Sequence, residues 1–338
     1  MVSLAFAGAG WITPMHAMAA KALGIDIQAF ASRTAEHAEA KAREFGGRAV
    51  TYDKLPAGAD IVVVATPPSR HVADALHALA AGAAVLVEKP LATTLVDADR
   101  LVAADTEGRV AYAENLAHCP AVQAMLSRLG SIGTPSYIEI RMAGPRPTYG
   151  QFLTPEWGGG ALFDLGAHPI ALVLLLAGSA RVTSVTATIE AGSDHRSDEA
   201  ATVTLSFDTG LRATVIVSWR ADLPQWDAQV SGPTGVVRAE LLPTASVEHN
   251  GDAVALPRPK FSPIQIETLG YMAQLRSFAG DLATDHRPVL DATFGRLVLD
   301  VICAAYASAG NGSTSVAVPF AGPRDRTPLQ LWRGLSAG

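Results

Sequence analysis

Residues 4–13 read Leu4-Ala5-Phe6-Ala7-Gly8-Ala9-Gly10-Trp11-Ile12-Thr13, an apolar run that ends in Gly-x-Gly and leads into a helical pattern. This pattern is typical of a dinucleotide-binding βαβ unit, in which Gly8 permits the tight turn and Gly10 lets backbone N–H groups approach a pyrophosphate. The phosphates then lie on the helix N-terminus at Trp11 and Ile12, where unpaired N–H groups and the helix dipole favour negative charge. A plain βα turn is the alternative. Thr13 occupies the third glycine position, and we expect it to loosen the helix–strand packing slightly.

The composition predicts a well-buried globular protein. The chain has 338 residues, of which 49% are apolar and 17% charged, and its net charge is −6. No basic run stands out, which argues against nucleic acid as a partner. Only Cys119 and Cys303 occur, so we expect neither a disulfide framework nor a metal cluster, and a reducing cytoplasm fits. We see no signal peptide, and the most apolar stretch, 170–177, is too short to span a bilayer, so no membrane association is expected.

Strand and helix signals alternate over the first 115 residues. Strands are predicted at 2–7, 26–31, 49–52, 60–65, 84–88 and 109–113, and helices at 11–23, 34–45, 69–81 and 93–106. The continuous apolar runs 61–65 and 84–87 are typical of strands covered on both faces. We therefore predict an α/β Rossmann domain, a doubly wound parallel sheet, over residues 1–117.

The pattern changes after residue 118. A helix at 119–129 and a strand beginning near Pro135 precede long alternating strands at 181–190, 199–207, 211–219, 226–232 and 235–241, and helices follow at 264–284 and 291–309. Alternation with period two predicts a sheet with two unlike faces. Residues 118–338 should thus form an α+β domain with a large, mostly antiparallel open sheet, and its C-terminal segment is left open to packing against the first domain.

Ser32 and Arg33 end the second predicted strand, where NAD-binding sheets place an acidic residue for the ribose 2′-OH. A hydroxyl and a guanidinium instead suit a 2′-phosphate, which Arg binds through charge-assisted hydrogen bonds. This favours NADP(H) over NAD(H). The alternative is a solvated Arg33 that caps the next helix.

Glu88-Lys89-Pro90 follows the strand at 84–88. Because ligands bind at the carboxyl ends of strands in such sheets, Lys89 is placed to contact a substrate hydroxyl or carbonyl oxygen. Partial burial would lower the pKa of this lysine toward a useful value. A surface lysine is the alternative.

Asp164 and His168 follow the glycines 158–160 and are four residues apart, hence on one face if the segment is helical. Histidine is the usual proton shuttle near neutral pH. Pro169 disfavours regular helix at His168, so a bend is also open. A hydrogen-bonded core pair is the alternative.

These features in this order resemble the glucose–fructose oxidoreductase / inositol dehydrogenase / rhizopine-catabolism (Gfo/Idh/MocA) family, and the resemblance covers nearly the whole chain. Its motifs are Gly8-Ala9-Gly10, Thr66-Pro67-Pro68 with His71, Glu88-Lys89-Pro90, Gly159-Gly160 with Asp164-x-Gly166-x-His168, and 304–309. The resemblance implies that Lys89 is the catalytic lysine, often before a cis proline, that His168 is the general acid/base and that Asp164 orients the substrate. It also implies that Thr66, Pro67, His71, Glu88 and Lys89 flank the cofactor.

Two positions depart from the family pattern. Many relatives carry Asp where this chain has Ala171, and Arg shortly before the proline that matches Pro120, where this chain reads Asn115-Leu116-Ala117-His118-Cys119. Because these positions shape the substrate site, the substrate need not be the commonest type. We expect substrate loops at 142–158 and 220–227.

The expected function is that of an NADP-dependent oxidoreductase that transfers hydride between nicotinamide and a secondary alcohol or ketone of a sugar, polyol or sugar-like metabolite. The alternatives are a redox-assisted glycosidase with retained nicotinamide, an imine or unsaturated-ring reductase, and a non-catalytic nucleotide-sensing regulator. Relatives pair subunits through the open sheet face. A low-charge face here, formed by Thr186, Thr188, Thr202, Thr204, Thr214 and Ile216, suggests a homodimer or homotetramer.

Overall fold

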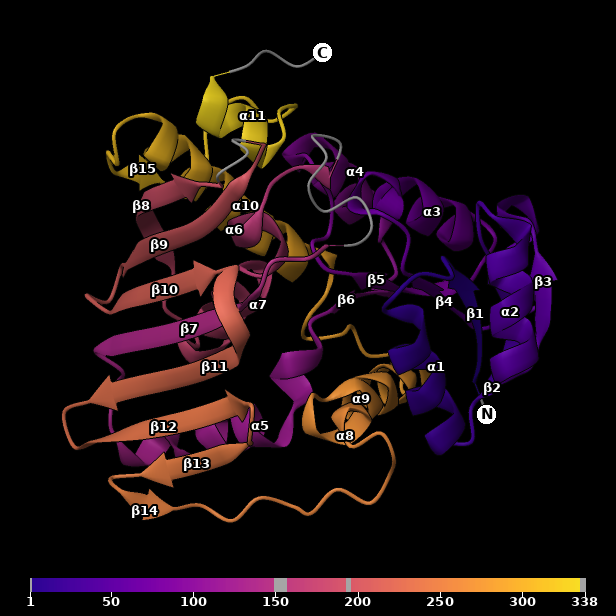
Figure 1. Ribbon diagram of the computed structural model, residues 1–338, viewed down its shortest axis with the longest axis horizontal. Coiled ribbons are helices and arrows are strands. Elements are labelled where there is room, and N and C mark those ends of the chain that lie inside the picture. The colour runs from indigo at the N-terminus through magenta and orange to yellow at the C-terminus, as the bar shows by residue number, and fades with distance from the viewer. Residues whose placement is uncertain (1, 149–156, 193–195, 335–338) are drawn as a thin grey trace. The chain divides into compact units, whose positions relative to one another are not determined.

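The computed structural model describes residues 2–148, 157–192 and 196–334, and the chain divides into two compact units. The first unit consists of Met1–Ala92, Val96–Cys119 and Pro259–Arg296, and the second of Thr93–Leu95, Pro120–Arg258 and Leu297–Gly338. One sheet is parallel and the other is mostly antiparallel (Figure 1). The predicted fold class is therefore confirmed.

Within the described residues, six parallel strands form the sheet of the first unit, in the order β3-β2-β1-β4-β5-β6. They are β1 (Ser3–Ala7), β2 (Asp26–Ala31), β3 (Arg48–Val50), β4 (Ile61–Val64), β5 (Ala84–Glu88) and β6 (Val110–Ala113). Every residue of β4 and β5 is buried, as continuous apolar runs predict. The strand order reverses between β1 and β4, and ligands bind at the carboxyl ends of strands at such a switch point.

Helices α1 (Thr13–Ala22), α2 (Ala35–Phe45), α3 (Pro68–Ala80) and α4 (Leu95–Ala104) and the 3₁₀ turn η1 (Tyr52–Lys54) connect these strands, and the 3₁₀ turn η2 (Asn115–His118) follows β6. The predicted helix 264–284 is wrong as one element, because it is split into α8 (Gln265–Thr268) and α9 (Tyr271–Ala283). Gly270, between them, has φ +85°, and a Cβ there would lie 2.2 Å from the carbonyl oxygen of Asn115. From α9, Leu275 and Phe278 join the hydrophobic core of the sheet.

In the described part of the second unit, nine strands form a sheet in the order β14-β13-β12-β11-β7-β10-β9-β8-β15. They are β7 (Tyr137–Pro145), β8 (Val182–Ala191), β9 (Asp198–Phe207), β10 (Arg212–Ser218), β11 (Arg220–Gly232), β12 (Gly235–Leu242), β13 (Ser246–His249), β14 (Asp252–Ala253) and β15 (Val316–Ala317). Only the β7–β10 pair is parallel among the described pairings of this sheet. Period two holds in β10, where Ala213, Val215 and Val217 are buried and the residues between them are not.

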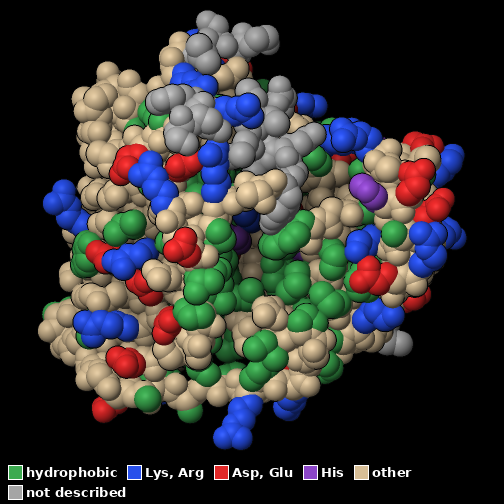
Figure 2. Space-filling view, viewed as in Figure 1, with side chains coloured by type: hydrophobic (Ala, Val, Ile, Leu, Met, Phe, Trp, Pro, Cys, Tyr) green, Lys and Arg blue, Asp and Glu red, His purple; other side chains and the backbone are tan. Residues whose placement is uncertain are grey.

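Helices α5 (Pro120–Arg128), α6 (Ala161–Asp164), α7 (Ala167–Leu176) and α11 (Pro328–Arg333) and the 3₁₀ turn η3 (Leu129–Ser131) lie in the second unit. Figure 1 shows α5 and α7 against one face of the sheet, with α5 on β12 and β13 and α7 on β7 and β10. The other face carries the more polar side of the strands. Lys, Arg, Asp and Glu side chains are interspersed over the visible face of this unit rather than gathered by sign (Figure 2).

The long helix α10 (Ala292–Gly310) contains the division between the two units. Of the helices in the described residues, it alone is long and apolar enough to cross a membrane by length and composition. Its length and composition are weak evidence for a membrane span, because 67% of its apolar window is buried, as in the core helix of a soluble protein.

The structure tests the two expected substrate loops, 142–158 and 220–227, to different extents. Residues 220–227 belong to β11, so the prediction of a loop there is wrong. The pairing with β7 is nevertheless irregular between Arg220 and Gln225, which lets the strand bulge. In the other expected loop, residues up to Pro145 belong to β7, and 149–156 lie outside the described residues.

Candidate cofactor and active site

The turn after β1 requires glycine. Gly8 has φ +114°, and a Cβ on it would lie 2.4 Å from the carbonyl oxygen of Ala65, the residue after β4. Its N–H donates to the carbonyl of Ala31 at 2.9 Å, which ties the turn to β2. Gly10 differs, because no described residue other than its two chain neighbours lies within 4 Å of where its Cβ would stand. The backbone at Gly10 is thus open to a ligand, which fits the predicted pyrophosphate position.

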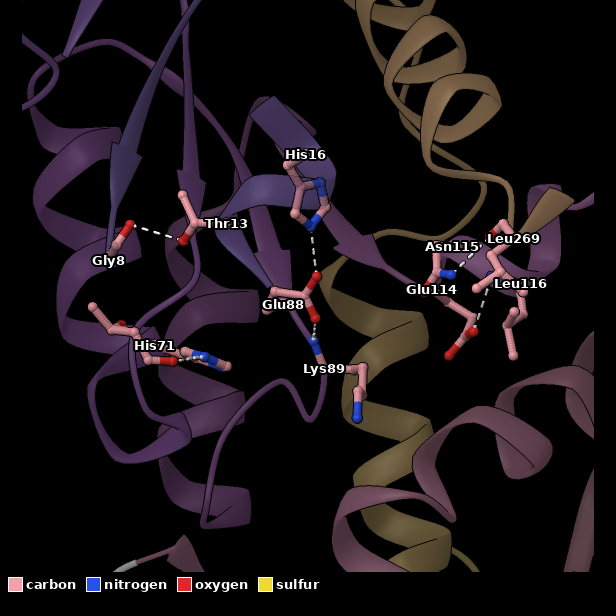
Figure 3. A network of polar contacts seen from close by, with 11 residues as sticks. Gly8, Thr13, His16, His71, Glu88, Lys89, Glu114, Asn115, Leu116 and Leu269 are labelled. Atoms are coloured by element: carbon pink, nitrogen blue, oxygen red, sulfur yellow. Dashed lines mark hydrogen bonds and ion pairs between the residues drawn. The ribbon is translucent and has the colours of Figure 1, made fainter. Parts of the chain in front are cut away.

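Thr13 does not loosen the packing, contrary to expectation. It is fully buried, and its hydroxyl donates to the carbonyl of Gly8 at 3.0 Å (Figure 3). A glycine at this position would allow close packing of helix and strand but could not make this contact. The hydroxyl of Thr13 adds a hydrogen bond that closes the turn. Trp11 and Ile12 stand between Gly10 and α1, and the Trp11 side chain is 68% exposed.

Ser32 and Arg33 lie directly after β2, and the Arg33 side chain is exposed. Tyr52 of η1 lies beside them, with the guanidinium of Arg70 stacked 4.8 Å above its ring centroid. Burial raises the pKa of Tyr52, as does Asp74, whereas Arg70 and Arg33 lower it. The sequence did not indicate Tyr52 or Arg70, because neither residue is part of a motif. Arg70 is paired with Asp74 at 2.6 Å, so Arg33 carries the less compensated charge.

Thr66, Pro67 and His71 form the junction between β4 and α3. The Thr66 hydroxyl donates to Asp74 at 2.8 Å. His71 is buried, and its Nδ1 and Nε2 lie 2.9 and 2.7 Å from the carbonyl oxygens of Pro90 and Thr66. Burial lowers the pKa of His71, and the two carbonyls oppose that shift. Since both ring nitrogens face the backbone, we interpret His71 as a residue that joins two loops of the site.

Glu88 is the centre of a buried network at the end of β5 (Figure 3). One carboxylate oxygen lies 2.6 Å from Nε2 of His16, and the other accepts the backbone N–H of Lys89 at 3.0 Å. The Lys89–Pro90 peptide bond is cis. Lys89 is half-buried, and the contact with Glu88 holds its backbone at the end of the strand. Sequence reasoning missed His16, which lies 72 residues from Glu88.

Asp164 and His168 lie at a bend in the second unit. Asp164 ends α6, Gly166 is the N-cap of α7, and His168 is in its first turn, so the two residues are on different helices. Pro169 fits this first turn, where a backbone N–H would lack a helical partner. His168 is only 7% exposed, and its ring lies 6.0 Å from that of Trp226 on β11. Trp226 is a further residue that no motif indicated.

The structure thus places the predicted residues in two sets. Gly8, Ser32, Thr66 and Lys89 all follow strands of the first sheet at its carboxyl edge. Asp164 and His168 belong to the second unit. Within the described residues, no group of three or more His, Cys, Asp or Glu side chains could hold a metal ion.

The fold and these residues are typical of a dinucleotide-binding α/β oxidoreductase, and comparisons with known proteins support this class. Residues 2–115 match the oxidoreductase family with an NAD-binding Rossmann fold, and residues 122–238 match the GFO/IDH/MocA C-terminal domain. The trans-1,2-dihydrobenzene-1,2-diol dehydrogenase of Oryctolagus cuniculus is 30% identical over 64% of this chain and 67% of its own length.

Two further similarities extend over almost the whole chain. The D-xylose 1-dehydrogenase [NADP(+)] of Haloarcula marismortui is 27% identical over 93% of this chain and 92% of its own length. The crystal structure of GenD2 from gentamicin A biosynthesis, in complex with NAD, covers 94% of this chain and 96% of its own, at 26% identity and a TM-score of 0.82. This chain belongs to the Gfo/Idh/MocA family and is an NAD(P)-dependent oxidoreductase of the type that acts on CH–OH donors.

Proposed function

We propose that the protein is an NADP-dependent oxidoreductase that acts on a secondary alcohol or ketone of a sugar, polyol or sugar-like metabolite. The observation that carries this proposal is the contact by which Glu88 holds the backbone of Lys89 at the carboxyl edge of the first sheet. The turn after β1 lies at the same edge and is open to a ligand at Gly10. The related D-xylose dehydrogenase, named for NADP(+), supports both the substrate class and the cofactor. A cytoplasmic location goes with this proposal.

The cofactor fits the residues of the first unit. Backbone N–H groups at Gly10, Trp11 and Ile12 would hold the pyrophosphate, and Ser32 and Arg33 would hold the 2′-phosphate. When bound, the nicotinamide supplies or takes up hydride at its C4 atom. Thr66, Pro67 and Glu88 would border it, with His71 supporting the Thr66 and Pro90 backbones.

The protein's own groups would handle the proton and the substrate oxygen. The ammonium of Lys89 would polarise the reacting oxygen, and a ring nitrogen of His168 would exchange the alcohol proton. The carboxylate of Asp164 would hold a neighbouring hydroxyl.

Turnover of NADPH or NADP⁺ with polyols, aldoses, ketoses and nucleotide-linked sugars tests the proposal. We expect Lys89→Ala and His168→Ala each to lower kcat by about 10²- to 10⁴-fold, the usual effect of a positioned acid/base group. The dissociation constant of NADPH should change little, because its phosphate contacts lie elsewhere. The pH profile of kcat/KM should lose one limb in the His168 variant, whereas His37→Ala, on the exposed face of α2, should behave as the parent.

Other outcomes point to other functions. Full turnover by the His168 variant on the true substrate contradicts its assigned role. NADPH binding without turnover of any substrate would favour a nucleotide-sensing regulator. Cofactor that is retained through purification and not consumed would favour a redox-assisted glycosidase, and reduction of imines alone would favour the reductase alternative.

A further inference from the structure

Asp198, at the start of β9, is completely buried and accepts three hydrogen bonds. One carboxylate oxygen accepts the N–H of Gly160 at 2.8 Å and the hydroxyl of Tyr306 at 2.5 Å. The other oxygen accepts the N–H of Leu162 at 2.7 Å. A buried carboxylate with this many donors is costly to disturb, because removing one partner leaves another polar group buried and unpaired.

The hydroxyl of Tyr306 completes this arrangement from α10. It is fully buried, and the N–H of Gly160 also lies within 3.2 Å of its oxygen. Burial, with Asp198 beside it, raises the pKa of Tyr306 well above its ordinary value, so the hydroxyl remains a donor to the carboxylate. The side chains of Asp198 and Tyr306 therefore hold the backbone between 160 and 162 from two distant parts of the chain.

The glycines of this segment are explained by the same packing. A Cβ at Gly160 would lie 2.1 Å from the carbonyl oxygen of Asp198, and one at Gly159 would lie 2.7 Å from the hydroxyl of Tyr306. The segment thus lies against both residues without room for a side chain.

The held backbone leads directly to the proposed catalytic groups. The N–H of Asp164 donates to the carbonyl of Gly160 at 2.9 Å, so α6 starts from the residue that Asp198 holds. A Cβ at Gly166 would lie 2.3 Å from the carbonyl oxygen of Leu162, the other residue that Asp198 holds. Gly166 is the N-cap of α7, so its contact with Leu162 also fixes where α7 starts. The position of His168, in the first turn of α7, is fixed with it.

We propose that Asp198 and Tyr306 are positioning residues that fix the α6–α7 bend, and with it Asp164 and His168, for the reaction. This inference rests on the proposed function for the roles of Asp164 and His168. Neither positioning residue need touch the substrate. Misplacing a reacting group by about 1 Å can lower a rate by about 100-fold, so loss of this support should reduce kcat more than cofactor binding.

Tyr306→Phe is the sharpest test, because it removes one hydroxyl and keeps the ring. We expect kcat to fall about 10- to 100-fold, while the NADPH dissociation constant stays within twofold of the parent. Amide hydrogen exchange of the segment 159–168, measured without substrate, should become about tenfold faster. Asp198→Asn should do the same more strongly, since a donating amide nitrogen would replace one of the two accepting oxygens and would face the N–H of Leu162 or of Gly160.

Two matched variants control for general loss of stability. Ser308→Ala removes hydrogen bonds that join the same helix to Ala187 and Thr314, two partners outside the glycine segment. Tyr112→Phe removes a buried hydroxyl that has no hydrogen-bond partner in the described structure. Both should keep kcat within twofold of the parent and leave exchange of 159–168 unchanged, even where the melting temperature of the Ser308 variant falls.

The inference is overturned if Tyr306→Phe keeps kcat within twofold of the parent, or if its exchange at 159–168 matches that of Ser308→Ala. The positioning role of Asp198 and Tyr306 and the proposed function can be tested separately. A parent protein that turns over no substrate would refute the proposed function, while the exchange measurement would still support or refute the hold on the α6–α7 bend. If Asp198→Asn fails to fold, the Tyr306 variant alone decides.

Discussion

Arg33 stands where an NAD-binding sheet would place a carboxylate, and its surroundings suit a 2′-phosphate. The nearby Arg70 is already neutralised by Asp74 at 2.6 Å. Arg33 is exposed, so it can reach an added phosphate without first breaking a buried contact. The proposed preference for NADP(H) should therefore depend mainly on Arg33.

We predict that Arg33→Ala weakens NADPH binding by about 10- to 100-fold, because a charge-assisted phosphate contact contributes roughly 1.5–3 kcal/mol. NADH binding should be nearly unchanged. Fluorescence titration with both cofactors measures this. Arg43→Ala, an exposed arginine on α2, serves as the charge-matched control. Equal dissociation constants for NADPH and NADH in the parent would refute the preference.

His118 gives the chain a pH-dependent stability at one residue. It ends η2, and burial lowers its pKa below the ordinary value of about 6.5. The unfolded chain therefore binds this proton more readily than the folded one. Its contribution to stability is present above the unfolded pKa and is lost as pH falls through the lower folded pKa.

His118→Gln removes this titration while keeping a polar side chain. We predict that the melting temperature of the parent falls relative to that of the variant as pH drops below about 6.5. The difference between the two proteins isolates His118 from buried carboxyls such as Asp198, whose pKa is raised by burial and whose effect has the opposite sign. Parallel melting curves from pH 7 to about 5 would contradict the prediction.

The β1–α1 turn shows how one element depends on another. Gly8 needs both a positive φ and an absent side chain, because the carbonyl oxygen of Ala65 after β4 would lie 2.4 Å from a Cβ. Gly24, after α1, has φ +69° but nothing within 4 Å of a Cβ. The two glycines therefore separate the cost of backbone conformation from the cost of a close approach.

Gly24→Ala should lower the free energy of unfolding by about 1 kcal/mol, the cost of the left-handed conformation alone. Gly8→Ala should cost about 3 kcal/mol or more, since backbone atoms must also move apart. Urea denaturation measures both, and NADPH binding should fail only in the Gly8 variant. Similar losses in the two variants would show that the contact with Ala65 is easily relieved.

The elements were largely predictable where pattern is local. Continuous apolar runs indicated β4 and β5, and alternation indicated β9 and β10. The break between α8 and α9 was not predictable, because it depends on the contact between Gly270 and the distant carbonyl of Asn115.

The candidate site shows the same limit. Lys89 and His168 stand in short motifs, which sequence can reveal. The contacts of His16 with Glu88 and of Asp198 with Tyr306 join residues 72 and 108 positions apart, so only the fold brings them together. Motifs thus indicate the groups proposed to react, whereas the groups that hold them emerge from packing.

At the scale of the whole molecule, the open face of the second sheet is where we propose that subunits pair. Cross-strand register places Thr204 opposite both Thr186 and Thr214, and Thr202 opposite both Thr188 and Ile216. The six residues therefore form one continuous patch on β8, β9 and β10. On β7, Glu139 and Arg141 lie opposite Thr214 and Ile216, so charge borders the patch on that side. A weakly charged centre with a charged rim is typical of an interface.

Light scattering tests the assembly of the intact protein. We predict a mass of at least twice the 35.1 kDa chain for the parent at micromolar concentration. Thr204→Arg, at the centre of the patch, should shift the protein toward the monomer, because two arginines would be buried against each other across a symmetric interface. Thr209→Arg adds the same charge in the exposed turn between β9 and β10 and should leave the mass unchanged. A parent mass near that of one chain would refute pairing, and an unchanged mass for Thr204→Arg would place the interface elsewhere.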